Sequence, residues 1–88
     1  MENKVLVNLI IPEIEQSFDI FLPVNEVIWR VKKMLVKSVG DITNTNFNAV
    51  YSILVNKDTN MIYKNNEIII NTDIRNASEL ILLLKKTL

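Results

Sequence analysis

Residues 79–85 read ELILLLK, a nearly continuous apolar run with a charged residue at each end. Such a run predicts a β-strand in the middle of a sheet, with a neighbouring strand on each side. Upstream, residues 50–56 (VYSILVN) predict another strand, which ends in a turn at residues 56–58. Between these two strands, residues 61–63 predict a short strand, and residues 68–70 a strand or an irregular apolar segment.

The N-terminal part of the chain predicts an antiparallel hairpin. Residues 4–11 (KVLVNLII) alternate, and residues 17–22 (SFDIFL) alternate again after the polar link at 12–16. The residues that this alternation directs to the buried face are Val5, Val7, Leu9, Ile11, Phe18, Ile20 and Leu22.

After residue 23 the apolar period changes from two to about 3.6, which predicts an amphipathic helix over residues 25–39. Asn25 suits the N-cap, and Gly40 stands where a C-cap favours glycine. Residues 41–49 are polar and predict a loop. The buried side of this helix is expected to hold Val24, Val27, Ile28, Val31, Met34, Leu35 and Ser38.

Strand, strand, helix, strand, short strand and final central strand is the element order of a β-grasp, or ubiquitin-like, fold. We therefore predict the α+β class, with a mixed sheet of four to five strands and one amphipathic helix on one face. The first and last strands are expected to lie parallel to each other. With 88 residues and 49% hydrophobic residues, the chain is expected to form a single domain over residues 1–88.

Composition narrows the range of functions. Ten basic residues balance ten acidic ones, which disfavours a nucleic-acid partner, because binding to phosphates usually needs a basic excess. Residues 1–4 lead directly into a strand pattern without a signal peptide, and no apolar run is long enough for membrane insertion. Together with the absence of cysteine, these features predict a cytoplasmic protein.

The residue types for common catalytic chemistry are missing. The chain has no histidine and no cysteine, so the usual general base, thiol nucleophile and metal ligands are absent. A single glycine leaves no glycine-rich phosphate loop. Glu13 and Glu15 lie two positions apart on the predicted hairpin loop, where solvated carboxylates are the simpler interpretation. We expect no enzyme activity, no cofactor, no metal and no small-molecule substrate.

The strand register predicts a protein-binding surface on the sheet face away from the helix. If Leu80 and Leu82 point to the core, Ile81 and Leu83 point outward. The same reasoning directs Ile53 and Val55 inward. The residues predicted to gather on the open face are Leu6, Leu54, Ile81 and Leu83, with Phe21 facing the same way. An uncovered apolar cluster commonly marks an interface, although loop residues 57–70 could instead cover it.

Trp29 is a second candidate for protein binding. It is predicted opposite the buried side of the helix, beside Val36, and exposed tryptophans are frequent binding hot spots. Alternatively, the 41–49 loop with Phe47 folds over it. Arg30, Lys33 and Lys37 on the outer helix face are expected mainly to be solvated.

Several short motifs resemble the YukD/EsaB family, the ubiquitin-like accessory proteins of bacterial type VII secretion systems. Pro23-Val24 precedes the helix, residues 55–58 (VNKD) close the third strand, and Ile74, Asn76 and Leu80 lead into the last strand. Ala77 is a departure, because this turn often holds glycine in the family. The resemblance implies an accessory or regulatory role through contacts with a component of the secretion machinery.

Two other functions stay open on the sequence alone. A ubiquitin-like carrier or modifier would need a flexible Gly-Gly terminus, whereas residues 85–88 read KKTL. If this is the natural terminus, it does not suit conjugation. The other is a generic β-grasp adaptor outside secretion. The sequence is also compatible with a homodimer.

Overall fold

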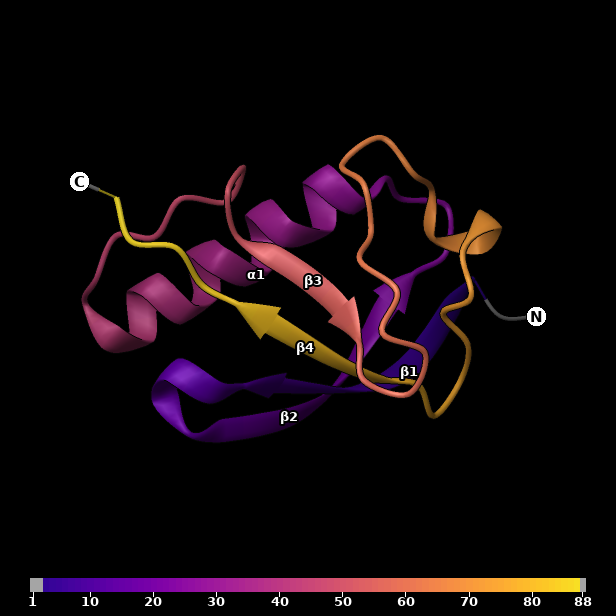
Figure 1. The fold of residues 1–88 in the computed structure, drawn as a ribbon, viewed down its shortest axis with the longest axis horizontal. Helices are drawn as coiled ribbons and strands as arrows, with labels where there is room; N and C mark the ends of the chain where they lie inside the picture. Colours follow the sequence, from indigo (N-terminus) through magenta and orange to yellow (C-terminus); the bar gives the residue numbers. More distant parts are fainter. Residues whose placement is uncertain (1–2, 88) are drawn as a thin grey trace.

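A four-stranded mixed sheet with one helix across one face forms the fold (Figure 1). The computed structural model describes residues 3–87, so the expectations placed on residues 1, 2 and 88 lie outside the described part. The elements are β1 (Lys4–Ile11), η1 (Pro12–Ile14), β2 (Gln16–Pro23), α1 (Ile28–Thr43), β3 (Ile53–Asn56), η2 (Ile69–Asn71) and β4 (Glu79–Leu83), where η denotes a 3₁₀ turn.

The strands lie in the order β2-β1-β4-β3. β4 pairs parallel with β1 and antiparallel with β3, so the last strand is central, as predicted. The β1–β2 hairpin is antiparallel, in register from Lys4 opposite Pro23 to Ile11 opposite Gln16. This arrangement confirms the predicted α+β class and the β-grasp fold.

The helix begins and ends later than predicted, because tertiary contacts rather than local caps set its ends. The N–H groups of Ile28 and Trp29 donate to the carbonyls of Glu67 (2.7 Å) and Asn65 (3.0 Å), so Asn25 is not the N-cap. Asn44, with φ of 55°, is the C-cap in place of Gly40. Gly40 lies inside α1, where a Cβ would come within 2.7 Å of the Thr45 carbonyl oxygen.

The buried side of α1 is rotated relative to the prediction. Met34 and Ser38 are exposed, whereas Val36 and Lys32 are buried. The Lys32 ammonium donates to the Val50 carbonyl at 3.3 Å, which anchors this flank of the helix over the β3 side of the sheet. Burial lowers the pKa of Lys32, because the charged form loses hydration. The buried residues of α1 are Ile28, Val31, Lys32, Val36 and Val39.

The register predicted for β3 is wrong by one residue. Leu54 is completely buried together with Ser52, whereas Ile53 is 39% exposed on the opposite face. Ser52 is tolerated inside because its hydroxyl donates to the Asn48 carbonyl (2.7 Å) and accepts from the Lys85 N–H (3.0 Å). β3 is also shorter than predicted, and β4 ends at Leu83 rather than at residue 85.

The segment between β3 and β4 contributes to the core without forming a regular strand. Tyr63, Ile69 and Ile74 are buried. Of the short strand predicted at residues 61–63, one isolated bridge between Val55 and Ile62 is present. Residues 68–70 contain the start of η2 instead of a strand.

Candidate protein-binding site

The sheet face opposite α1 carries an apolar cluster built from three strands and one loop. Ile53 pairs with Leu83, Val55 pairs with Ile81, and Ile81 pairs with Ile10 across the parallel strands. Directly paired residues point to the same face, so these side chains adjoin. We call this cluster the open-face patch and define it as Ile10, Ile53, Val55, Ile62, Ile81 and Leu83.

The patch is accessible at its outer members and firmly supported beneath. Leu83 is 40% exposed and Ile62 is 60% exposed. Their strand neighbours Leu80 and Leu82 are completely buried against the helix side, as predicted. A binding surface on regular strands keeps its shape, which lowers the ordering cost of association.

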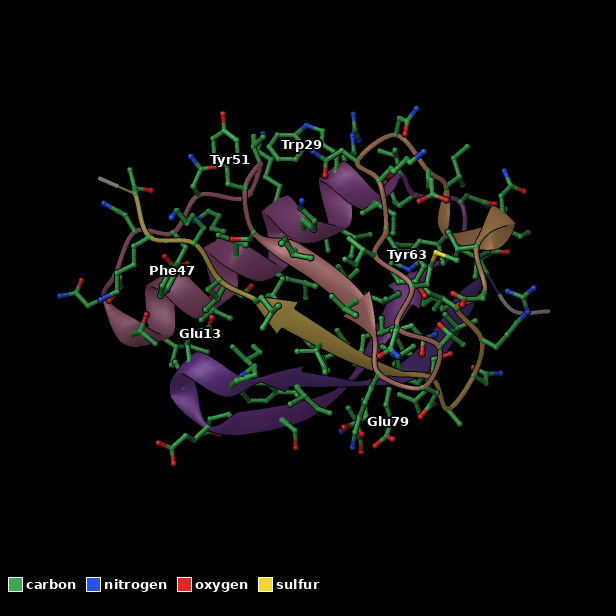
Figure 2. All side chains as sticks on the ribbon, in the orientation of Figure 1. Glu13, Trp29, Phe47, Tyr51, Tyr63 and Glu79 are labelled. Atoms are coloured by element: carbon green, nitrogen blue, oxygen red, sulfur yellow. The ribbon has the colours of Figure 1, made fainter. Side chains whose placement is uncertain are left out.

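The predicted site residues separate into three groups. Ile81 and Leu83 belong to the open-face patch, and Leu6 lies on the same face but pairs with Phe21 beyond a polar row. Leu54 is buried and cannot contribute to an exposed surface, which corrects the prediction. Trp29 lies on the helix, away from this face (Figure 2).

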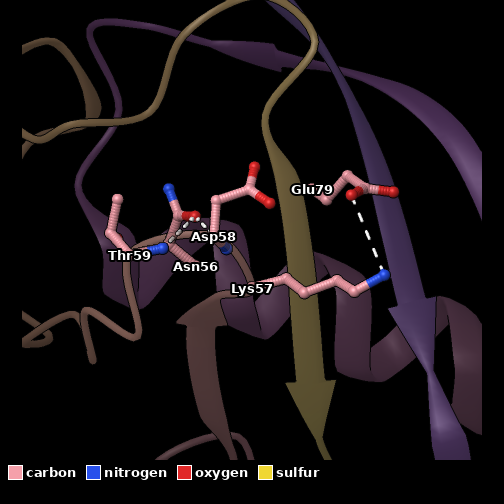
Figure 3. Close-up of polar contacts among 5 residues, drawn as sticks. All are labelled: Asn56, Lys57, Asp58, Thr59 and Glu79. Atoms are coloured by element: carbon pink, nitrogen blue, oxygen red, sulfur yellow. Dashed lines mark hydrogen bonds and ion pairs between the residues drawn. The ribbon is translucent and has the colours of Figure 1, made fainter.

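A polar row crosses the open face between the patch and the Leu6–Phe21 pair. The Asn8 side chain donates to the Asp19 carboxylate at 3.1 Å. The Lys57 ammonium lies 3.8 Å from the carboxylate of Glu79, the first residue of β4 (Figure 3). Both sides of this ion pair are about half exposed, so its contribution to stability is small. The row therefore borders the patch with exposed polar and charged side chains.

The turn after β3 is fixed by one buried side chain. The Asn56 side-chain oxygen, Oδ1, accepts from the N–H groups of Asp58 (2.9 Å) and Thr59 (3.2 Å), an arrangement drawn in Figure 3. Its amide donates to the Tyr63 hydroxyl at 3.2 Å, which in turn donates to Asp73. This explains structurally why asparagine occupies the third-strand motif noted in the sequence.

The pKa values of Tyr63 and Asp73 are both shifted where these two side chains meet. Burial raises the pKa of Tyr63, and the hydrogen bond to Asp73 raises it further. For Asp73, burial alone would raise the pKa, but hydrogen bonds from Tyr63 and Thr59 outweigh it and lower the pKa. Both shifts favour the protonated Tyr63 phenol and the ionised Asp73 carboxylate. The hydrogen bond between them therefore stabilises the fold.

The turn before β4 also follows its motif. The Asn76 side chain accepts from the Leu6 N–H at 2.8 Å, and Ile74 and Leu80 are buried. Ala77 has φ of 73°, the left-handed region that favours glycine, and its N–H donates to the Leu6 carbonyl at 2.8 Å. Alanine therefore occupies a backbone conformation in which glycine would be less strained.

Trp29 is half-buried on one flank of α1, beside Val50. Figure 2 places Phe47 toward the other end of the helix, so Phe47 does not cover Trp29. A shallow hollow of about 400 Å³ adjoins the indole, lined by Val27, Trp29, Val50, Asn65 and Asn66. Val36, predicted to lie beside Trp29 on the outer face, is buried.

The carboxylates of the hairpin loop have structural positions. Glu13 accepts a hydrogen bond from the Leu84 N–H at 3.0 Å, just after β4. Glu15 is the residue after η1, with φ of 53°. Across residues 3–87, no group of three or more metal-ligating side chains of the His, Cys, Asp or Glu type comes together.

Sequence reasoning missed Ile53, Val55 and Ile62 as members of the open-face patch. For Ile53 and Val55 the cause is the register of β3. Ile62 lies in a stretch with a weak strand pattern, and its bridge to Val55 depends on how the 57–63 turn folds back. The register of β3 depends on the hydrogen bonds that allow Ser52 and Asn56 to be buried, and the sequence pattern carries no signal for these bonds.

The chain shares its fold with ubiquitin-like domains. It resembles the N-terminal ubiquitin-like domain of the 4931431F19Rik protein with a TM-score of 0.71 and 18% identity, covering 100% of this chain and 81% of that one. The ubiquitin-like domain of Arabidopsis thaliana At2g32350 gives a TM-score of 0.69 and 16% identity, covering 98% and 82%.

A chain of the MycP5-free ESX-5 inner membrane complex is also similar, with a TM-score of 0.75 and 14% identity. The match covers 99% of this chain but 22% of that larger one. No protein-family model matches the sequence, and no curated protein matches it. At these identities the comparisons define a ubiquitin-like fold. No helix within residues 3–87 is long and apolar enough to cross a membrane.

Proposed function

We propose that this chain is a non-enzymatic, ubiquitin-like accessory or regulatory protein of a bacterial type VII secretion system. It acts in the cytoplasm by binding a component of the secretion machinery through the open-face patch. The observation that carries this proposal is the exposed apolar cluster on the uncovered face of the sheet.

The patch has the properties of a protein-binding site. It is apolar at its centre and bordered by the polar row of Asn8, Asp19, Glu79 and Lys57, the layout of a typical interface with a polar rim. Isoleucines and leucines exposed at 39–60% lose water on binding, which drives association. A protein surface suits this shape better than a small molecule, because the patch is a strand surface rather than a deep cavity.

The secretion role is supported by two independent likenesses. The motifs at residues 23–24, 55–58 and 74–80 resemble the YukD/EsaB family. The fold is similar to part of a chain in the ESX-5 complex, a type VII secretion assembly. The absence of histidine and cysteine from the sequence supports a role without catalysis.

The test is a clean deletion of the gene, complemented with the wild-type chain or with single variants. We expect the deletion to impair export of the small helical substrates of the system, and the wild-type gene to restore it. Unchanged export in the deletion would contradict the secretion role.

The Leu83→Asp variant tests the patch itself. It places a charge on an exposed member of the open-face patch and should abolish both complementation and capture of the secretion component. Ile70→Asp is the matched control, because Ile70 is 56% exposed outside the open face and should complement fully. Thermal unfolding of both purified variants must show an intact fold, and full complementation by a folded Leu83→Asp protein would contradict the patch.

An intact mass from cells separates this proposal from conjugation. We expect the unmodified mass of the chain. A mass increase matching attachment to another molecule, or trimming at the C-terminus, would favour the carrier or modifier.

A further inference from the structure

The two edges of the sheet differ in how they are closed. On the β3 side, the chain folds back after the turn, so that the Asn56 N–H donates to the Met61 carbonyl (2.9 Å) and the Tyr63 N–H to the Leu54 carbonyl (3.1 Å). β2 lies at the opposite edge of the sheet, and Figure 1 shows it along the border of the molecule. β2 is therefore the edge at which a further strand can be added.

The register identifies the free backbone groups of β2. In β1, the Asn8 N–H donates to the Ser78 carbonyl (3.0 Å) and the Leu6 carbonyl accepts from Ala77 (2.8 Å), so these residues direct their backbone toward β4. Their partners in β2, Asp19 and Phe21, then direct theirs away from β1. Ser17, which pairs with Ile10, follows by the same alternation, so its backbone groups also point away from β1.

Apolar side chains line one flank of this edge. Phe18 and Ile20 of β2 are half-buried on the helix side of the sheet. A side chain of an added strand that points to the helix side of the sheet would therefore meet Phe18 and Ile20.

Asp19 decides which strand can pair here. It is the only charged residue in β2, and its side chain lies on the open face beside Asn8. If two copies of this chain paired their β2 edges antiparallel about Asp19, the two Asp19 carboxylates would stand directly opposite each other. Like charges in that position are destabilising, whereas a lysine or arginine would be favourable. The charge disfavours self-pairing and favours a basic partner residue.

We propose that the β2 edge binds an extended segment of a partner protein as an added strand. The segment has a lysine or arginine opposite Asp19, with an apolar residue on each side of it that packs on Phe18 and Ile20. Backbone hydrogen bonds to Ser17, Asp19 and Phe21 hold the strand, and the alternation of side chains sets specificity. This surface is distinct from the open-face patch, so the inference does not rest on the proposed function.

The probe is a peptide of sequence Thr-Val-Thr-Val-Lys-Val-Thr-Val-Thr, capped at both ends, titrated into the ¹⁵N-labelled full chain. We expect amide shift changes centred on Ser17, Asp19 and Phe21, and slower hydrogen exchange at these three N–H groups. The same peptide with a central glutamate should bind about tenfold more weakly, because attraction to Asp19 becomes repulsion. Equal affinity for the two peptides, or binding of neither, overturns the proposal.

Variants locate the site. Asp19→Lys should reverse the preference between the two peptides, a result that loss of folding cannot imitate. Leu83→Asp on the open-face patch should change neither affinity. Shift changes confined to the patch would overturn the proposal. The alternative is that a second copy of the chain occupies the β2 edge, and sedimentation of the free wild-type chain tests it. A dimer whose β2 amides are protected from exchange would overturn the proposal in favour of self-association.

Discussion

The Tyr63 hydroxyl donates a hydrogen bond to the Asp73 carboxylate and accepts one from the Asn56 side chain, so a single phenol joins the end of β3 to the segment before β4. Asn56 in turn holds the turn at residues 57–59. These contacts keep Ile62 in place beside Val55, and thereby shape one border of the open-face patch.

Removing the hydroxyl should loosen this connection. We expect Tyr63→Phe to lower the free energy of unfolding by about 1–3 kcal/mol, because Asn56 loses a buried partner. Urea denaturation followed by circular dichroism measures the change. Tyr51→Phe is the control, since Tyr51 is 70% exposed, and it should stay within about 0.5 kcal/mol of the wild type.

Acid should weaken the same contact. The pKa of Asp73 in the folded chain is lowered from its ordinary value of 3.8, so its ionised form stabilises the fold above that value and the stabilisation is lost as the pH falls through the folded pKa. The difference in unfolding free energy between wild type and Asp73→Asn should therefore shrink between about pH 5 and about pH 2. A difference that stays constant over this range would contradict the assignment.

The observed register of β3 can be tested by a pair of truncations. Leu54→Ala should cost about 2–5 kcal/mol of stability, because it opens a cavity in the core. Ile53→Ala, one position earlier on the exposed face, should cost much less. Denaturation midpoints of the two variants measure this, and the reverse order would restore the register predicted from the sequence.

The turn before β4 offers a stabilising substitution. Ala77→Gly should raise the unfolding free energy by roughly 0.5–1 kcal/mol, because glycine adopts positive φ without the strain that alanine carries. Ala49→Gly is the comparison, because Ala49 is not among the positive-φ residues and packs against the core. It should lower stability, and a loss in both variants would argue against strain at Ala77.

Gly40 is expected to resist substitution even though it lies in a helix. Alanine favours helices by about 1 kcal/mol over glycine, but its Cβ would stand 2.7 Å from the Thr45 carbonyl oxygen. Overpacking of this kind costs about 1–3 kcal/mol, so Gly40→Ala should be neutral to destabilising in thermal unfolding. Ser38→Ala is the reference variant, because Ser38 lies on the exposed surface of the same helix and its substitution creates no steric clash. This variant should leave stability unchanged or slightly raise it.

The sequence predicted the elements well where one face of a strand is much more apolar than the other. β1 and β2 have that asymmetry, and their buried faces were predicted correctly. β3 does not, because two polar residues are buried there: Ser52, just before the strand, and Asn56, its last residue. Both are satisfied by hydrogen bonds to parts of the chain that sequence periodicity does not place nearby.

The ends and the rotation of the helix depended on similar distant partners. Its first N–H groups are capped by carbonyls of Asn65 and Glu67, far along the chain, so a local N-cap at Asn25 was the wrong signal. Burial of Lys32 required the Val50 carbonyl at the edge of β3. For the candidate site, Ile81 and Leu83 were predicted correctly as outward-facing, because Leu80 and Leu82 were assigned correctly to the core. Leu54 was predicted wrongly, because the pattern of β3 is ambiguous.

The central position of β4 has a consequence for how the protein is made. The strand that joins the hairpin to β3 is made after the other three, so the sheet cannot close until β4 has emerged from the ribosome. Until then, β1 exposes an unpaired edge and the helix has little to pack against, a state prone to wrong pairing. During synthesis, this domain should thus depend on chaperones more than a domain whose central strand is made first.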